Sequence, residues 1–109
     1  MKNISDINKE YYARFEDMVS LVNAMRKSQR VWSWGARGWT NVEGLFLKFR
    51  VSGHLFKGVV YIGVNGKDLF EIYLTNLKGV IQWQIADIDL DRLIDVIDEQ
   101  VERLPSYKW

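Results

Sequence analysis

The most unusual stretch of the sequence spans residues 31–41, where bulky aromatic side chains alternate with small and basic ones. It contains Trp32, Trp34 and Trp39, and it is accompanied by Arg30 and Arg37. Flat indole rings offer stacking surfaces to unpaired bases, and arginine supplies phosphate contacts and cation–π contacts. This combination predicts a surface that binds single-stranded nucleic acid.

A second set of aromatic and basic residues would share one face of a β-sheet. Phe46, Tyr61 and Tyr73 accompany Lys48 and Arg50 there, because side chains two residues apart in a strand point the same way. Together the two segments give the candidate binding residues, which are Arg30, Trp34, Arg37, Trp39, Lys48, Arg50, Tyr61 and Tyr73. The same residue types are enriched at protein–protein interfaces, so the alternative is an interaction module or a homodimer. The plainest interpretation is that the tryptophans close one end of the core.

Residues that could support catalysis or metal binding are few. His54 is the only histidine, it falls in a predicted turn, and the absence of cysteine excludes thiolate metal sites. The acids between Asp87 and Asp98 follow the count of a calcium loop, but Arg92 stands where that loop needs glycine. We therefore expect a non-enzymatic protein with no catalytic residue, metal or cofactor. A pocket that joined His54 to an acid such as Glu71 would change this interpretation.

The charged residues are unevenly distributed along the chain. Residues 24–57 contain seven basic side chains and one acid, for a net charge of +6, whereas residues 68–102 contain nine acids and two bases, for a net charge of −7. Such asymmetry indicates either a polyanionic partner for the basic part or head-to-tail association. The alternative is that folding brings the two parts together and they neutralise each other.

Four apolar or alternating runs organise the chain, and they predict an antiparallel meander over residues 45–51, 56–64, 69–74 and 80–85. We expect the core on the face formed by Leu45, Leu47, Phe49, Val51, Val60, Ile62, Val64, Phe70, Ile72, Leu74, Ile81, Trp83 and Ile85. The opposite face carries the second aromatic set together with polar residues, which predicts a sheet buried on one side only. Asn65-Gly66 is the strongest hairpin signal and predicts a type I′ turn.

Helical patterns flank the meander on both sides. Tyr11, Phe15, Met18, Val22 and Met25 recur at spacings of three and four, which predicts a helix over residues 5–28. A second apolar stripe predicts a helix over residues 89–104, which Asp87 or Asp89 would cap. The predicted fold is therefore α+β, an antiparallel sheet of four or five strands with one helix at each end. Residues 31–41 would add an edge strand or an ordered loop.

The location of the tryptophans separates these interpretations, because an indole ring in the core cannot also serve as an open stacking surface. We predict that Trp32 is buried and that at least one of Trp34 and Trp39 is substantially exposed near Arg37. Length and composition are typical of one domain over residues 1–109, with loose termini at 1–4 and 105–109. No apolar run is long enough for a membrane span, and the lack of cysteine agrees with a cytoplasmic protein.

Overall fold

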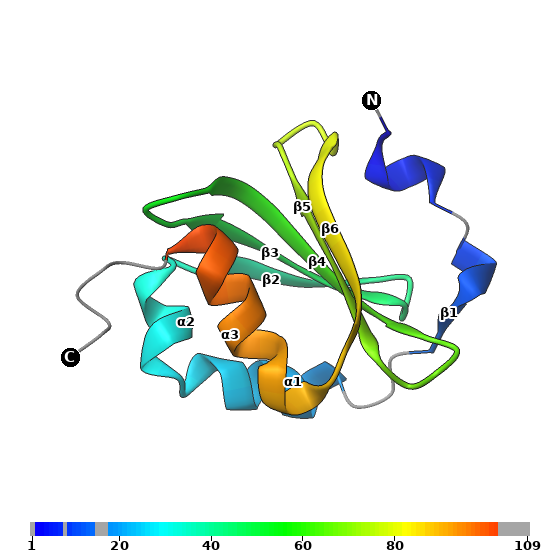
Figure 1. Cartoon of the computed structure of the whole chain (residues 1–109), viewed down its shortest axis with the longest axis horizontal. Helices are drawn as coiled ribbons and strands as arrows, with labels where there is room; N and C mark the ends of the chain where they lie inside the picture. Colours follow the sequence, from blue (N-terminus) through cyan, green and yellow to red (C-terminus); the bar gives the residue numbers. More distant parts are fainter. Residues whose placement is uncertain (1, 8, 15–17, 103–109) are drawn as a thin grey trace.

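The protein has an α+β fold built around one antiparallel sheet (Figure 1). The computed structural model describes residues 2–7, 9–14 and 18–102. Helices lie against one face of the sheet, and residues from the N-terminal segment pack on the other face. The predicted fold class is therefore confirmed.

The five main strands follow one another as a meander, each paired with the next in antiparallel register. They are β2 (Arg37–Val42), β3 (Phe46–Ser52), β4 (Lys57–Asn65), β5 (Phe70–Thr75) and β6 (Ile81–Ile88). The four predicted runs correspond to β3, β4, β5 and β6. Residues 31–41, which we expected to form an edge strand or an ordered loop, contain the end of a helix (Gln29–Ser33) and most of the edge strand β2.

Three helices cover the first face of the sheet, and most of the predicted core residues pack against them (Figure 1). Leu45 and Ile81, which we placed on this face, pack in the cluster on the opposite face instead. They are α1 (Met18–Arg26), α2 (Gln29–Ser33) and α3 (Leu90–Val101). Helix α3 begins after Asp89, whose side chain accepts a hydrogen bond of 3.1 Å from the Arg92 N–H, as an N-cap does. Its apolar stripe is fully buried at Leu93, Ile97 and Val101. None of the helices in the described ranges is long and apolar enough to cross a membrane.

The predicted helix over residues 5–28 is wrong in its first half. The chain instead forms two 3-10 turns, η1 (Ile4–Asp6) and η2 (Lys9–Tyr11), followed by the short strand β1 (Tyr12–Ala13). Strand β1 pairs with the last two residues of β4, just past the point where β3 stops pairing with it. Helix α1 is described from Met18 onward, and Phe15, which we placed on the helical stripe, lies outside the described residues.

The N-terminal segment lies across the second face of the sheet instead of forming a helix, because that face is apolar and needs a cover. Tyr12 lies over this face, with its ring centroid 4.7 Å from that of Phe46. Gly63 makes room for both rings, since a Cβ atom there would lie 2.8 Å from Phe46. The buried members of this cluster are Tyr12, Phe46, Val59, Tyr61 and Tyr73, and Ile4, Ile7, Val42, Leu45 and Ile81 pack against them. The prediction of a sheet buried on one side only is therefore wrong.

The first residues are also tied to the sheet. The Ile4 N–H donates to the carbonyl of Gly79, and the Ile81 N–H donates to the carbonyl of Lys2, both at 2.8 Å. Residues 2–4, which we expected to be loose, thus form part of the β5–β6 end of the sheet. Residues 105–109 lie outside the described ranges.

The hairpin between β4 and β5 forms as predicted, but its turn is of a different kind. Positive φ occurs at Asp68 (61°), whereas Gly66 is not among the residues with positive φ. The pattern expected of a type I′ turn, positive φ at two adjacent central residues, is found instead at Glu43 (54°) and Gly44 (72°), between β2 and β3. The Asn65-Gly66 prediction failed because the side chain of Asn65 has other partners.

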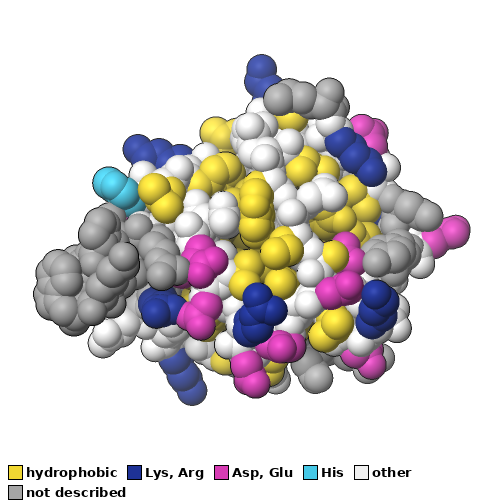
Figure 2. Space-filling view, in the orientation of Figure 1, with side chains coloured by type: hydrophobic (Ala, Val, Ile, Leu, Met, Phe, Trp, Pro, Cys, Tyr) yellow, Lys and Arg dark blue, Asp and Glu magenta, His cyan; other side chains and the backbone are white. Residues whose placement is uncertain are grey.

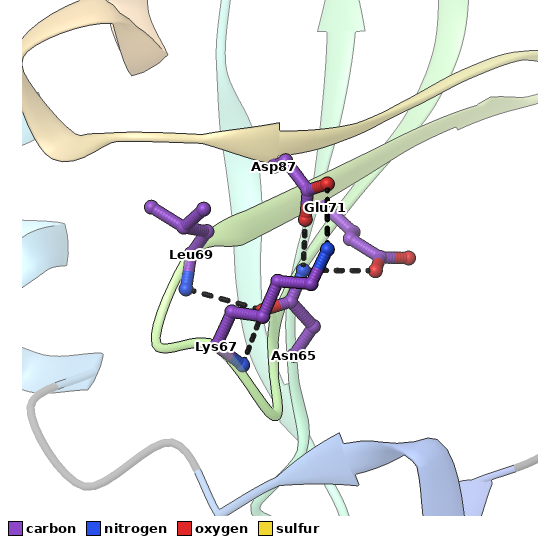
Figure 3. A network of polar contacts seen from close by, with 5 residues as sticks. All are labelled: Asn65, Lys67, Leu69, Glu71 and Asp87. Atoms are coloured by element: carbon purple, nitrogen blue, oxygen red, sulfur yellow. Dashed lines mark hydrogen bonds and ion pairs between the residues drawn. The ribbon is translucent and has the colours of Figure 1, made fainter.

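The Asn65 side chain uses all four of its hydrogen-bonding positions (Figure 3). Its Oδ1 accepts from the N–H groups of Lys67 at 2.9 Å and Leu69 at 3.2 Å. Its Nδ2 donates to Glu71 Oε2 at 3.1 Å and to Asp87 Oδ1 at 2.7 Å. One fully buried amide therefore joins the β4–β5 hairpin to β6.

We predict that Asn65→Ala destabilises the fold by about 2 kcal/mol more than Asn76→Ala. Asn76 occupies the equivalent place in the β5–β6 hairpin, where its Oδ1 accepts from the N–H groups of Lys78 and Val80, both at 2.9 Å. Only Asn65 also donates to two carboxylates, one of them buried. Urea unfolding of both variants measures the difference. Equal losses would show that the amide matters only for the turn.

Candidate functional site

A basic hollow lies where the end of α1, helix α2 and the start of β2 meet. Its volume is about 550 Å³, and its lining consists of Arg26, Val31, Trp32, Ala36, Arg37, Gly38 and Trp39. These residues include two arginines and two tryptophans, and no acid. We refer to these seven residues as the basic hollow.

Trp32 is the most exposed large apolar side chain described, at 83%. The prediction that this residue is buried is therefore wrong. Residues 29–33 form a helix, in which positions three apart share a face. Val31 and Trp34 are buried in the core, so Trp32 between them faces outward. A helical interpretation of residues 29–34 would have predicted that Trp32 is exposed and Trp34 is buried.

Trp34 belongs to the core and is fully buried. Its Nε1 donates a hydrogen bond of 2.8 Å to Asp98 Oδ1 on α3, which gives the indole N–H the partner that burial requires. Its ring stacks beside Phe49 on β3, with an interplanar angle of 9°. The candidate binding residue Trp34 is therefore structural.

Trp39 is half-buried and lies on the same aromatic stack. Its ring centroid is 4.3 Å from that of Phe49, which leaves the indole in both the core and the wall of the basic hollow. Neither Trp34 nor Trp39 is in the exposed state that we predicted for at least one of them. Trp32 is instead the exposed ring next to Arg37.

The predicted arginines have different surroundings. Arg37 is exposed, and its guanidinium donates a hydrogen bond of 3.1 Å to the carbonyl of Gly35. Arg50 is also exposed and lies opposite Arg37 in the β2–β3 pair. Arg30, in contrast, forms an ion pair with Asp95 on α3, so its charge is partly neutralised.

The second aromatic set does not form an open surface. Tyr61 and Tyr73 are buried under the N-terminal segment, and Lys48 lies with its Nζ 5.7 Å from the centroid of the Tyr61 ring. Of the predicted set, the half-buried Lys48 and the exposed Arg50 carry the charge on this side. The structure thus separates the candidate residues, and Arg37 and Trp39 are the two that line the basic hollow.

Five of the hollow's seven residues were not among the candidates, and two of these five, Arg26 and Trp32, belong to the basic and aromatic types of the predicted set. Arg26 ends α1, where its charge also favours the helix dipole, and Trp32 was assigned to the core. The separation of charge in the sequence is partly cancelled in space by the ion pair between Arg30 of the basic segment and Asp95 of the acidic segment. Figure 2 shows acidic and basic side chains side by side over the lower part of the face that carries the helices. The acid-free lining of the basic hollow stands apart from this mixture.

Side chains that could bind a metal do not form a cluster in the described part of the chain. Within residues 2–7, 9–14 and 18–102, no group of three or more His, Cys, Asp or Glu side chains is placed to hold an ion. His54 is exposed, and its backbone N–H donates to Glu102 Oε2 at 2.6 Å.

Comparisons with protein-family models, curated proteins and solved structures found no match. Functional inference therefore rests on the chemistry of the hollow.

We predict that Trp34→Ala lowers the free energy of unfolding by about 3–5 kcal/mol, because it leaves a large cavity and removes a partner of buried Asp98. Trp32→Ala should change it by less than about 0.5 kcal/mol, since an exposed ring contributes little to packing. Denaturant unfolding of both variants checks this. Comparable losses would contradict the assignment of Trp34 to the core and Trp32 to the surface.

Proposed function

We propose that this protein is a non-enzymatic accessory protein that binds single-stranded nucleic acid at the basic hollow. The observation that carries the proposal is the 83% exposed indole of Trp32, which lines the hollow together with Arg26 and Arg37. An exposed ring of this size is unfavourable in water. A base stacked on it would remove that apolar surface from solvent.

The size and charge of the hollow fit a nucleotide unit. Its volume of about 550 Å³ lies within the range of small-ligand sites. The guanidinium groups of Arg26 and Arg37 can contact phosphate oxygens in pairs of hydrogen bonds. No acid lines the hollow, so nothing in the lining repels a phosphate.

An unpaired strand suits the site better than a duplex. Stacking on Trp32 needs the face of a base, and in a duplex those faces are covered by neighbouring base pairs. The second ring, Trp39, is fixed by its stacking on Phe49, so it loses little conformational freedom on binding. The cysteine-free sequence agrees with our placement of the protein in the cytoplasm.

We predict that the protein binds an oligothymidine of about 20 nucleotides at low salt, and that Trp32→Ala weakens binding about tenfold. Arg26→Ala and Arg37→Ala should each weaken binding and reduce the slope of log affinity against log salt by about one. Fluorescence anisotropy of a labelled oligonucleotide measures both effects. A duplex of equal length should bind more weakly.

Lys78→Ala is the matched control, because it removes one exposed positive charge from the β5–β6 hairpin, outside the hollow. Equal weakening by Lys78→Ala and Arg37→Ala would mean that binding follows net charge alone. No binding of either strand form at low salt would overturn the proposal.

An interaction module, including a homodimer, is the second candidate, and an apolar groove beside the basic hollow favours it. The groove, of about 220 Å³, lies between α1 and the edge strand β2, and its lining includes Met18, Val22, Trp39 and Leu47. Val19 also lines it and is 74% exposed. Apolar surface at a free sheet edge is suited to protein contacts.

If the groove forms a homodimer, the molar mass measured by light scattering should rise with protein concentration, and Val19→Asp should abolish the rise. Thr40→Asp at the polar part of the groove lining adds the same charge and serves as a control for electrostatic repulsion. A constant monomer mass at all concentrations would exclude the homodimer.

A further inference from the structure

A second hollow lies on the opposite face of the sheet, between the N-terminal segment and strands β5 and β6. Its volume is about 290 Å³, and its lining includes Lys2, Ile7, Tyr12, Glu71, Tyr73 and Gln84. We refer to it as the Glu71 hollow. It shares no residue with the basic hollow, so the inference below does not depend on the proposed binding of nucleic acid.

Glu71 is 5% exposed and has only neutral hydrogen-bond donors. The Tyr12 hydroxyl donates to its Oε1 at 3.0 Å, and the Asn65 amide donates to its Oε2 at 3.1 Å. The Tyr73 hydroxyl lies 3.4 Å from the same Oε1. Among the described residues, no lysine or arginine forms an ion pair with Glu71.

A buried carboxylate without a cation is unusual, because burial of a charge is costly unless an opposite charge compensates it. Asp98 and Glu102 are also buried, but neither lines the Glu71 hollow, the basic hollow or the apolar groove. Of these three buried acids of the described residues, Glu71 is the one that lines one of these three spaces. A cation that entered this space would supply the missing charge.

We propose that the Glu71 hollow binds a primary ammonium or guanidinium group. The carboxylate would accept charge-assisted hydrogen bonds from such a group. The rings of Tyr12 and Tyr73 meet edge to face, with centroids 6.4 Å apart, and offer aromatic surface to a cation. The Gln84 side chain is a further acceptor at the rim.

The lining of the hollow holds two charged side chains, the buried Glu71 and the exposed Lys2. Lys2 is the basic residue of its lining, and Lys67 is already paired with Asp87. Burial, followed by the contacts with Tyr73 and Glu71, raises the pKa of Tyr12 above its ordinary value. Burial also raises the pKa of Tyr73, and the nearby Glu71 raises this pKa further. Both hydroxyls therefore stay neutral at physiological pH and add no competing charge.

The cation could belong to a free small amine or to a lysine or arginine side chain of a peptide. Two pairs of probes distinguish these sources. Butylammonium and ethylguanidinium represent free cations, and the blocked tripeptides acetyl-Gly-Lys-Gly-amide and acetyl-Gly-Arg-Gly-amide represent side chains. Butanol and acetyl-Gly-Gln-Gly-amide are the neutral controls.

Titration of the ¹⁵N-labelled protein, followed by amide chemical shifts, tests the proposal. We expect cationic probes to shift the amides of Glu71, Tyr73 and Gln84, and neutral probes to leave them unchanged. Tighter binding of the tripeptides would assign the site to a peptide side chain, and tighter binding of the small cations would assign it to a free amine. Either result supports the proposal.

Two variants make the test specific. Glu71→Gln keeps the shape of the side chain and should weaken cation binding about tenfold. Gln84→Glu adds a negative charge at an exposed position of the rim and should strengthen cation binding severalfold. Because Gln84 is exposed, this result does not depend on whether the core tolerates Glu71→Gln. Asp91→Asn removes an exposed acid from the first turn of α3 and should have no effect.

The proposal is overturned if the lining amides do not respond to any cationic probe. It is also overturned if neutral probes shift them equally, or if Gln84→Glu leaves cation binding unchanged. Lys2→Ala shows whether the chain's own ammonium competes for the site. Stronger probe binding in that variant supports a cation site, and weaker probe binding contradicts it.

Discussion

The structure depends on one constraint, which is that both faces of the sheet are apolar and each has to be covered. Helices α1, α2 and α3 cover the first face and complete the main core. None of these three α-helices packs on the second face, and in the described part of the chain Ile4, Ile7 and Tyr12 of the N-terminal segment cover it. Apolar burial is the main favourable term in folding, and here it overrides the helical preference of the first residues.

This constraint also decides which aromatic residues remain available to a partner. Tyr61 and Tyr73 would form an open face if the sheet were buried on one side, but the N-terminal segment covers them. Trp34 and Phe49 connect α2 to β3 inside the core. The exposed ring next to the arginines is thus Trp32, which projects from a five-residue helix. The surface that we propose for binding lies in the region where α1, α2 and β2 meet.

Buried polar groups hold the second face in register. In the described part of the chain, every buried side-chain nitrogen or oxygen has a hydrogen-bond partner. Asn65 lies at the centre of these contacts and fixes the position of Glu71 and of Asp87, whose φ is positive. A half-satisfied polar cluster would cost more than an apolar one. The complete set of partners favours one strand register over its alternatives.

The strands of the meander and helix α3 could be predicted from the sequence because their signals are local. Alternation in β3 and β5, and the apolar stripe from Leu93 to Val101, depend only on neighbours along the chain. The same holds for the N-cap at Asp89. Most of the first-face core followed from that alternation, apart from Leu45 and Ile81, which lie on the second face.

Tertiary structure alone decided the conformation of the N-terminal segment, the exposure of the tryptophans and the turn at Asn65, because the same local pattern suits more than one environment. The spacing of apolar residues before Met18 fits a helix, and it also fits a segment that covers an apolar sheet face. Trp32 and Trp34 are two residues apart, so a strand would place them on one face, whereas helix α2 puts one ring in solvent and one in the core. Asn65-Gly66 favours a type I′ turn by itself, but the carboxylates of Glu71 and Asp87 bind the Asn65 amide. Those carboxylates come from other strands, and only the folded chain brings them together.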